Sequence, residues 1–95
     1  MTNEIIIGVK NLRMVKETIY SPCSGTVEKV LTKENNHVYE WEKLFLIKTH
    51  NGKIEEISIG ISGHITSLHV KKGQRVTKET SLAIIQDDLL ITGSD

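Results

Sequence analysis

The sequence predicts an all-β domain in which two similar halves close on each other. The chain from Ser24 to Ile47 is repeated from Ser62 to Ile85, at a constant offset of 38 positions and without a gap. Such a repeat indicates one supersecondary unit used twice, and two copies are too few for a solenoid. The apolar segments of both copies have the length and β-branched content of strands. An Asn-Gly pair between the copies marks the hairpin that joins them.

Each copy opens with a strand that we expect to carry a bulge. Apolar or β-branched residues recur at a spacing of three and then two. These residues are Val27, Val30 and Thr32 in the first copy and Ile65, Leu68 and Val70 in the second. The spacing is neither strict alternation nor a sustained helical period. Because a bulge shifts the apolar face of a strand in this way, a bulge is predicted at the same place in both copies.

A polar turn follows each of these strands. The turn reads KENNH in the first copy and KKGQR in the second, so that Gly73 stands where the first copy has Asn35. Glycine adopts positive φ freely and asparagine tolerates it, so we expect a left-handed residue at this position in both copies. Beyond the turn, each copy ends in an apolar run of buried-strand length, at 44–47 and 82–85.

The hairpin between the copies is predicted to have its tip at Asn51-Gly52. An Asn-Gly pair between β-prone runs favours a two-residue type I′ turn, in which both residues have positive φ. This turn places Lys48 directly opposite Glu55. Such a cross-strand pair contributes about 0.2–1 kcal/mol, so its expected role is solvated stabilisation of the hairpin.

The two ends of the chain lie outside the repeat. We divide the sequence into an N-terminal extension at 1–18, a central domain at 19–88 and a C-terminal tail at 89–95. In the extension, EIIIGV is expected to form a strand, and LRMV a second short strand or a docking segment. The alternative there is a short helix from Lys10 to Glu17. In the tail, Leu89–Ile91 leave open a further strand of the sheet.

Composition and charge exclude several classes of function. The chain has 95 residues, enough for one domain, and its 12 basic residues balance 12 acidic ones without a Lys/Arg cluster, which argues against a nucleic-acid partner. No apolar stretch is long enough to span a bilayer and no secretory signal pattern is present, so we expect no membrane partner and a cytoplasmic location. Cys23 fits a reducing compartment and is interpreted as a small, semi-buried hydrophobe.

Neither a catalytic arrangement nor a metal-ligand pattern is evident in the sequence. The four histidines do not have the spacing of zinc ligands; they are His37, His50, His64 and His69. Glu55 and Glu56 are adjacent on a strand and face opposite sides, so they cannot act together as general acid and base. No nucleophile–base pair and no phosphate-binding loop is found. We therefore predict a non-enzymatic protein without catalytic residues and without a metal site.

Several segments of the sequence, taken together, resemble the biotinyl/lipoyl carrier domain family, which includes biotin carboxyl carrier proteins. They are SPCSGTVEKV, a turn, Val38, the run at 44–47, a tight hairpin and ISGHITSLHVKKGQRV with SLAII, over Ile19–Asp87. The resemblance implies a flattened β-barrel or sandwich (a barrel-sandwich hybrid) of two four-strand halves related by a pseudo-two-fold axis. It also implies a hairpin lysine acylated by biotin or lipoate. Both copies have another residue, Trp41 or Glu79, where the family usually has its second glycine.

The joining hairpin departs from the family pattern at the attachment lysine. Biotin carriers show Met-Lys-Met at the tip and lipoyl domains show Asp-Lys-Ala, whereas this chain has KTHNGKI at 48–54. Counting forward from Val38 places the family lysine on Asn51. Counting back from Gly63 places it on Gly52. The two counts disagree by one position, so the hairpin is expected to hold one extra residue.

Two functions follow from this comparison. In the first, Lys53 carries biotin or lipoate, added by a biotin or lipoate ligase, and presents it to a multi-subunit enzyme of a biotin-dependent carboxylase system. The tip residues around Lys53 are His50, Asn51 and Gly52. Such a carrier performs no chemistry itself but keeps the group it carries at a high effective concentration. In the second, the chain is an unmodified binding or accessory module that lacks the attachment lysine and needs no cofactor.

Overall fold

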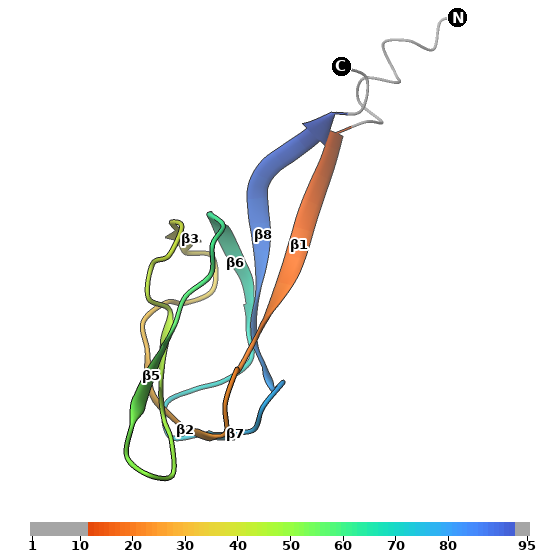
Figure 1. Ribbon diagram of the computed structural model, residues 1–95. Helices are drawn as coiled ribbons and strands as arrows, with labels where there is room; N and C mark the ends of the chain where they lie inside the picture. Colours follow the sequence, from red (N-terminus) through yellow and green to blue (C-terminus); the bar gives the residue numbers. More distant parts are fainter. Residues whose placement is uncertain (1–11, 93–95) are drawn as a thin grey trace, which may run out of the picture.

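Two four-stranded antiparallel sheets form a sandwich in the computed structural model, which describes the backbone of residues 12–92 and the side chains of residues 15–88 (Figure 1). The strands are β1 (Leu12–Tyr20), β2 (Gly25–Val30), β3 (His37–Val38), β4 (Phe45–Lys48), β5 (Ile54–Ile57), β6 (Gly63–Leu68), β7 (Arg75–Val76) and β8 (Ser81–Thr92). One sheet has the order β1-β8-β6-β3 and the other β5-β4-β2-β7. The predicted all-β flattened sandwich is confirmed. Residues 12–92 contain no helix with the length and hydropathy needed to cross a membrane.

The sequence repeat is reproduced strand by strand. β2 and β6 cover equivalent positions of the two copies, and so do the two-residue strands β3 and β7. The pairing of β2 with β4 shifts between Val27 and Lys29. The pairing of β6 with β8 shifts between Ile65 and Ser67, 38 positions later. The bulge predicted at the same place in both copies is therefore confirmed.

The two halves are interleaved. β3 of the first half pairs with β6 of the second, and β7 of the second half pairs with β2 of the first. The turns exchange equivalent bonds: the N–H of Asn35 donates to the carbonyl of Ile65 at 2.7 Å, and the N–H of Gly73 donates to that of Val27 at 2.8 Å. Each half thus completes the sheet of the other, as a pseudo-two-fold axis requires.

Left-handed backbone occurs at the predicted turn position and at one further position in each half. Asn35 has φ 73° and Gly73 has φ 89°, which confirms the prediction for both copies. Trp41 (φ 63°) and Glu79 (φ 78°) are also left-handed, at the places where the family usually has its second glycine. A non-glycine residue in this region costs roughly 1–2 kcal/mol. The surrounding backbone compensates, since the N–H of each residue donates a 2.8 Å hydrogen bond to a carbonyl of another segment.

The core lies between the sheets and is almost entirely aliphatic. Its fully buried side chains include Val38, Leu44, Phe45, Ile47, Ile65, Leu82 and Ile85. Two equivalent glycines allow the chain to pass close to a neighbouring strand. A Cβ on Gly25 would lie 2.3 Å from the carbonyl oxygen of Lys48, and one on Gly63 would lie 2.1 Å from that of Gln86. Only glycine fits at either position.

β1 and β8 form the longest pairing, and its outer part extends beyond the sandwich (Figure 1). The strand expected at LRMV is confirmed, and the alternative helix from Lys10 to Glu17 is wrong over residues 12–17, because β8 offers this segment a partner strand. β8 includes Leu89–Ile91, the strand that the sequence left open. The strand predicted at EIIIGV lies outside the described residues. The division of the chain at residues 18 and 88 stays a prediction, and β1 and β8 cross these limits.

Candidate functional site

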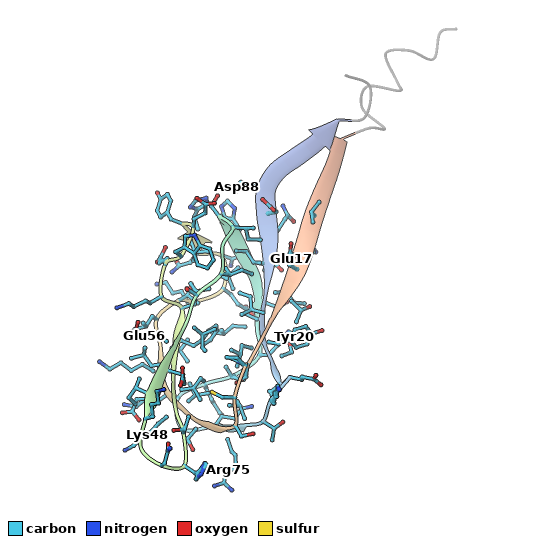
Figure 2. The ribbon with its side chains drawn as sticks, viewed as in Figure 1. Glu17, Tyr20, Lys48, Glu56, Arg75 and Asp88 are labelled. Carbon is cyan, nitrogen blue, oxygen red and sulfur yellow. The ribbon has the colours of Figure 1, made fainter. Side chains whose placement is uncertain are left out.

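The candidate attachment site is the hairpin that connects β4 and β5. Its first strand is fixed by the core, since Phe45 and Ile47 of β4 are fully buried and β4 lies beside β2. Side chains alternate along a strand, so Lys48 is exposed on the opposite face. The hairpin therefore projects from a well-anchored strand at the end of the sandwich where Figure 2 shows Lys48.

The hairpin has a three-residue loop in place of the predicted two-residue Asn-Gly turn. Lys48 pairs with Ile54 rather than with Glu55, so the predicted cross-strand pair is wrong by one position. The strands are closed by Thr49 and Lys53, where the N–H of Thr49 donates to the carbonyl of Lys53 at 2.8 Å. A shift of one residue moves side chains to the other face of a strand. Glu55 consequently pairs with Ile47 and lies on the face opposite to Lys48, the same face as Lys53 two residues earlier.

The hydrogen bonds of Thr49 explain why the loop is longer than predicted. The N–H of Gly52 donates to the carbonyl of Thr49 at 2.9 Å, which closes a β-turn centred on His50 and Asn51. Gly52 has φ 86°, whereas Asn51 lacks the positive φ of a type I′ turn. A turn followed by one left-handed residue is typical of three-residue hairpin loops. The Thr49 hydroxyl donates to the side-chain oxygen of Asn51 and accepts a 3.2 Å bond from the N–H of Lys53.

The structure brings the four predicted site residues together, but the lysine is not at the apex. His50, Asn51 and Gly52 form the exposed loop, and Asn51 is its middle residue. Lys53 follows on the returning side, where its side chain is 71% exposed and its Nζ lies 3.5 Å from Oε2 of Glu55. The extra residue inferred from the two counts is the third loop residue. Lys53 thus provides an accessible primary amine on the flank of the hairpin.

Two hollows border this hairpin, and both are lined in part by Thr49 and His50. The first has a volume of about 330 Å³ and is lined in part by Lys48, His50 and Arg75. Figure 2 shows Lys48 and Arg75 at the same end of the sandwich. The second has a volume of about 290 Å³ and is lined in part by Cys23 and Lys53. The first hollow suits an anionic group, and the second leaves room beside the Lys53 amine.

A second group of polar side chains, two imidazoles and a carboxylate, lies at the opposite end of the sandwich. It was not predicted from the sequence. His37 and His64 stand opposite each other in the pairing of β3 with β6, and Asp88 of β8 lies beside them. The spacing of the four histidines could not show this, because β3 and β6 belong to different halves. His50 and His69 are not part of the group. The exchange of strands between the halves is the signal that would have paired His37 with His64.

Comparison with known proteins supports the fold. No protein-family model matches the chain, and no curated protein matches it. The urea carboxylase of Kluyveromyces lactis is similar over 75% of this chain, with 21% identity and a TM-score of 0.67. A single-chain, multi-domain long-chain acyl-CoA carboxylase is similar over 78% of this chain, with 15% identity and a TM-score of 0.71. The chain spans 6% and 7% of the lengths of these enzymes. It therefore has the fold of a small part of two large carboxylases.

Proposed function

We propose that this chain is a carrier-like protein that presents a prosthetic group on Lys53 to a biotin-dependent carboxylase system. The observation that carries the proposal is an exposed lysine on the hairpin that joins two pseudo-symmetric halves of a sandwich. The similarity of this sandwich to parts of two carboxylases supports the same kind of partner. Biotin is the group that the sequence resemblance favours, and lipoate is the alternative.

The residues of the hairpin suit the attachment of such a group. A biotin or lipoate ligase would acylate Nζ of Lys53, and the attached group would supply the reactivity. Lys53 is accessible, and its acylation would break only the exposed ion pair with Glu55, worth about 0.2–1 kcal/mol. Thr49 holds the loop closed through its backbone and hydroxyl bonds. The protein would thereby deliver the group at a high effective concentration.

A second function is favoured by the residue at the apex. Asn51 occupies the middle of the loop, and Nζ of Lys53 lies near Glu55 on the same strand face. In this function the chain is an unmodified accessory module that uses the hairpin end as a binding surface. The cationic side chains of the 330 Å³ hollow would then attract acidic side chains of a partner protein.

Measurement of the intact mass separates the two functions. The full chain is coexpressed with a biotin ligase and, separately, with a lipoate ligase. The carrier function predicts a mass gain of one biotinyl or one lipoyl group, which is lost in Lys53→Arg and kept in Lys48→Arg, the matched control on the same hairpin. An unshifted mass with both ligases contradicts the carrier function. A gain that survives Lys53→Arg contradicts the site.

The variant Asn51→Lys serves as a positive control for the ligase. Asn51 lies at a central position of a turn without a positive φ, so a lysine is accommodated there. If the ligase modifies Asn51→Lys but leaves the natural chain unmodified under the same conditions, the ligase is shown to be active. That result would support the unmodified accessory module.

A further inference from the structure

Three side chains with metal-binding atoms converge from three strands of one sheet. His37 comes from β3, His64 from β6 and Asp88 from β8. One ligand atom of each lies within 4.8 Å of the others. Nε2 of His37 is 2.7 Å from Oδ2 of Asp88, and Nδ1 of His64 is 3.9 Å from Oδ1 of the same carboxylate. Both oxygens of Asp88 therefore face an imidazole nitrogen.

The fold fixes the backbone that supports these side chains. His37 and His64 are directly opposite in the antiparallel pairing of β3 with β6, and their rings meet edge to face with centroids 4.9 Å apart. The N–H of Asp88 donates to the carbonyl of Ser62 at 3.0 Å. The hydroxyl of Ser62 donates to Oδ2 of Asp88 at 3.2 Å. A hydrogen bond from a second residue orients the carboxylate, as is typical around metal ligands.

The chemistry of the three groups matches a transition-metal ion. Two imidazole nitrogens and one carboxylate oxygen are ligands of Zn²⁺, which binds them at about 2.0–2.2 Å. In a tetrahedral site these distances bring ligand atoms to roughly 3.3 Å from one another. The side chains of His37, His64 and Asp88 are 33%, 55% and 42% exposed, so they have room for the small rotations this requires.

We propose that His37, His64 and Asp88 bind a divalent transition-metal ion of the zinc class, with three protein ligands and a further position for water or a partner's side chain. The site lies at the end of the sandwich opposite the hairpin, as the labels of Asp88 and Lys48 in Figure 2 show. The ion ties the two-residue strand β3 to β6 and β8. Because this end does not include Lys53, the site is independent of whether the hairpin is modified.

Metal titration of the full, untagged chain tests this proposal. After treatment with a chelator, the chain is titrated with Zn²⁺ by calorimetry and with Co²⁺ by absorption spectroscopy. We expect one ion per chain and the visible bands of a low-coordinate Co²⁺ site. Each of the variants His37→Ala, His64→Ala and Asp88→Asn should lose at least about tenfold in affinity. The controls His50→Ala, His69→Ala and Cys23→Ser should keep the affinity of the natural chain.

Thermal unfolding with and without Zn²⁺ separates ligand loss from misfolding. Ligands that bind only the folded state raise its melting temperature. Zn²⁺ should raise the melting temperature of the natural chain and of the control variants, but not that of the three ligand variants, whose melting temperatures with chelator should stay close to that of the natural chain. Equal Zn²⁺ affinity in the natural chain and in His37→Ala, or loss of binding in Cys23→Ser or His50→Ala, would overturn the proposal. The proposal would also be overturned if the natural chain bound no Zn²⁺, because His37, Asp88 and Ser62 would then form only a hydrogen-bonded group.

Discussion

The hairpin end and the opposite end of the sandwich occupy equivalent places in the repeat, yet they present different side chains. At an offset of 38 positions, Thr26 and Arg75 at the hairpin end correspond to His64 and His37 at the opposite end. The same offset, extended three residues beyond the repeat, aligns His50 of the hairpin loop with Asp88 of β8. The hairpin end has a cationic hollow, and the opposite end has two imidazoles around a carboxylate. The two copies thus share the features of the backbone, namely the bulges, the close-packed glycines and the left-handed turns. The exposed side chains at the two ends differ.

The two ends also differ in how their outer strands are joined. At the hairpin end, β4 and β5 are connected by a three-residue loop. At the opposite end, β8 and β1 take the equivalent places, but they continue as a two-stranded ribbon beyond the sandwich (Figure 1). Of these two equivalent strand pairs, β4–β5 is thus the one whose strands are connected by a short loop. This difference is why we assign the carrier role to one end and the metal site to the other.

Substitution of the paired glycines should produce the largest effect. Gly25→Ala and Gly63→Ala each place a Cβ against a backbone carbonyl, which the strands can relieve only by separating. We expect each to lower the free energy of unfolding by about 3 kcal/mol or more, as measured by urea denaturation. The matched control is Gly73→Ala, where φ is positive but a Cβ meets no neighbour. It should lose only about 1–2 kcal/mol. Equal losses in Gly25→Ala and Gly73→Ala would contradict the close approach.

Replacing the equivalent left-handed residues Trp41 and Glu79 by glycine should change the free energy of unfolding by a smaller amount, and in opposite directions in the two halves. Glu79→Gly relieves the strain of a positive φ but makes the unfolded chain more flexible, so a net gain of about 0.5 kcal/mol is expected. Trp41→Gly relieves the same strain but removes a ring that lies against Gly60. That loss of packing should make the variant less stable by about 1 kcal/mol. Chemical denaturation measures both values, and a similar gain for both variants would show that the Trp41 ring contributes nothing.

The smallest effect concerns the acid titration of Asp88. A hydrogen bond from His37 lowers its pKa, with further lowering by Ser62 and by the charges of His37 and His64, against a rise from desolvation. A depressed pKa stabilises the folded state above the ordinary aspartate pKa, and this contribution is lost as the pH falls through the folded value. In His37→Ala, NMR titration of the Asp88 carboxyl should show a midpoint closer to the ordinary one. An unchanged midpoint would contradict the assigned cause.

The bulges and left-handed turns within each copy could be predicted from the sequence, whereas the loop length of the joining hairpin and the pairing between the halves could not. The spacing of Val27 and Val30 is enough to indicate a bulge, and Asn35 aligned with Gly73 is enough to indicate a left-handed turn. An Asn-Gly pair fits both two-residue and three-residue loops, and the hydroxyl of Thr49 favours the longer one. The longer loop changes the residue opposite Lys53 from His50 to Thr49, while Lys53 directly follows the loop in both cases.

The opposite end was missed for a different reason. His37 and His64 are separated by the whole hairpin in sequence, and they meet only because β3 crosses to the sheet of the other half. Asp88 joins them from β8, a third strand that contains neither histidine. Ligand spacing along one chain segment cannot reveal a site built from three strands. The repeat offset, combined with the strand exchange, would have revealed the pairing of the two histidines.

The most direct test of the carrier function is to locate the modified residue after coexpression of the natural chain with a biotin ligase. Peptide mapping by mass spectrometry should find one biotinyl group, on Lys53, with Lys48 and the other lysines unmodified. A chain that carries no group under conditions in which Asn51→Lys is modified, or a group on any lysine other than Lys53, would contradict the proposed attachment site.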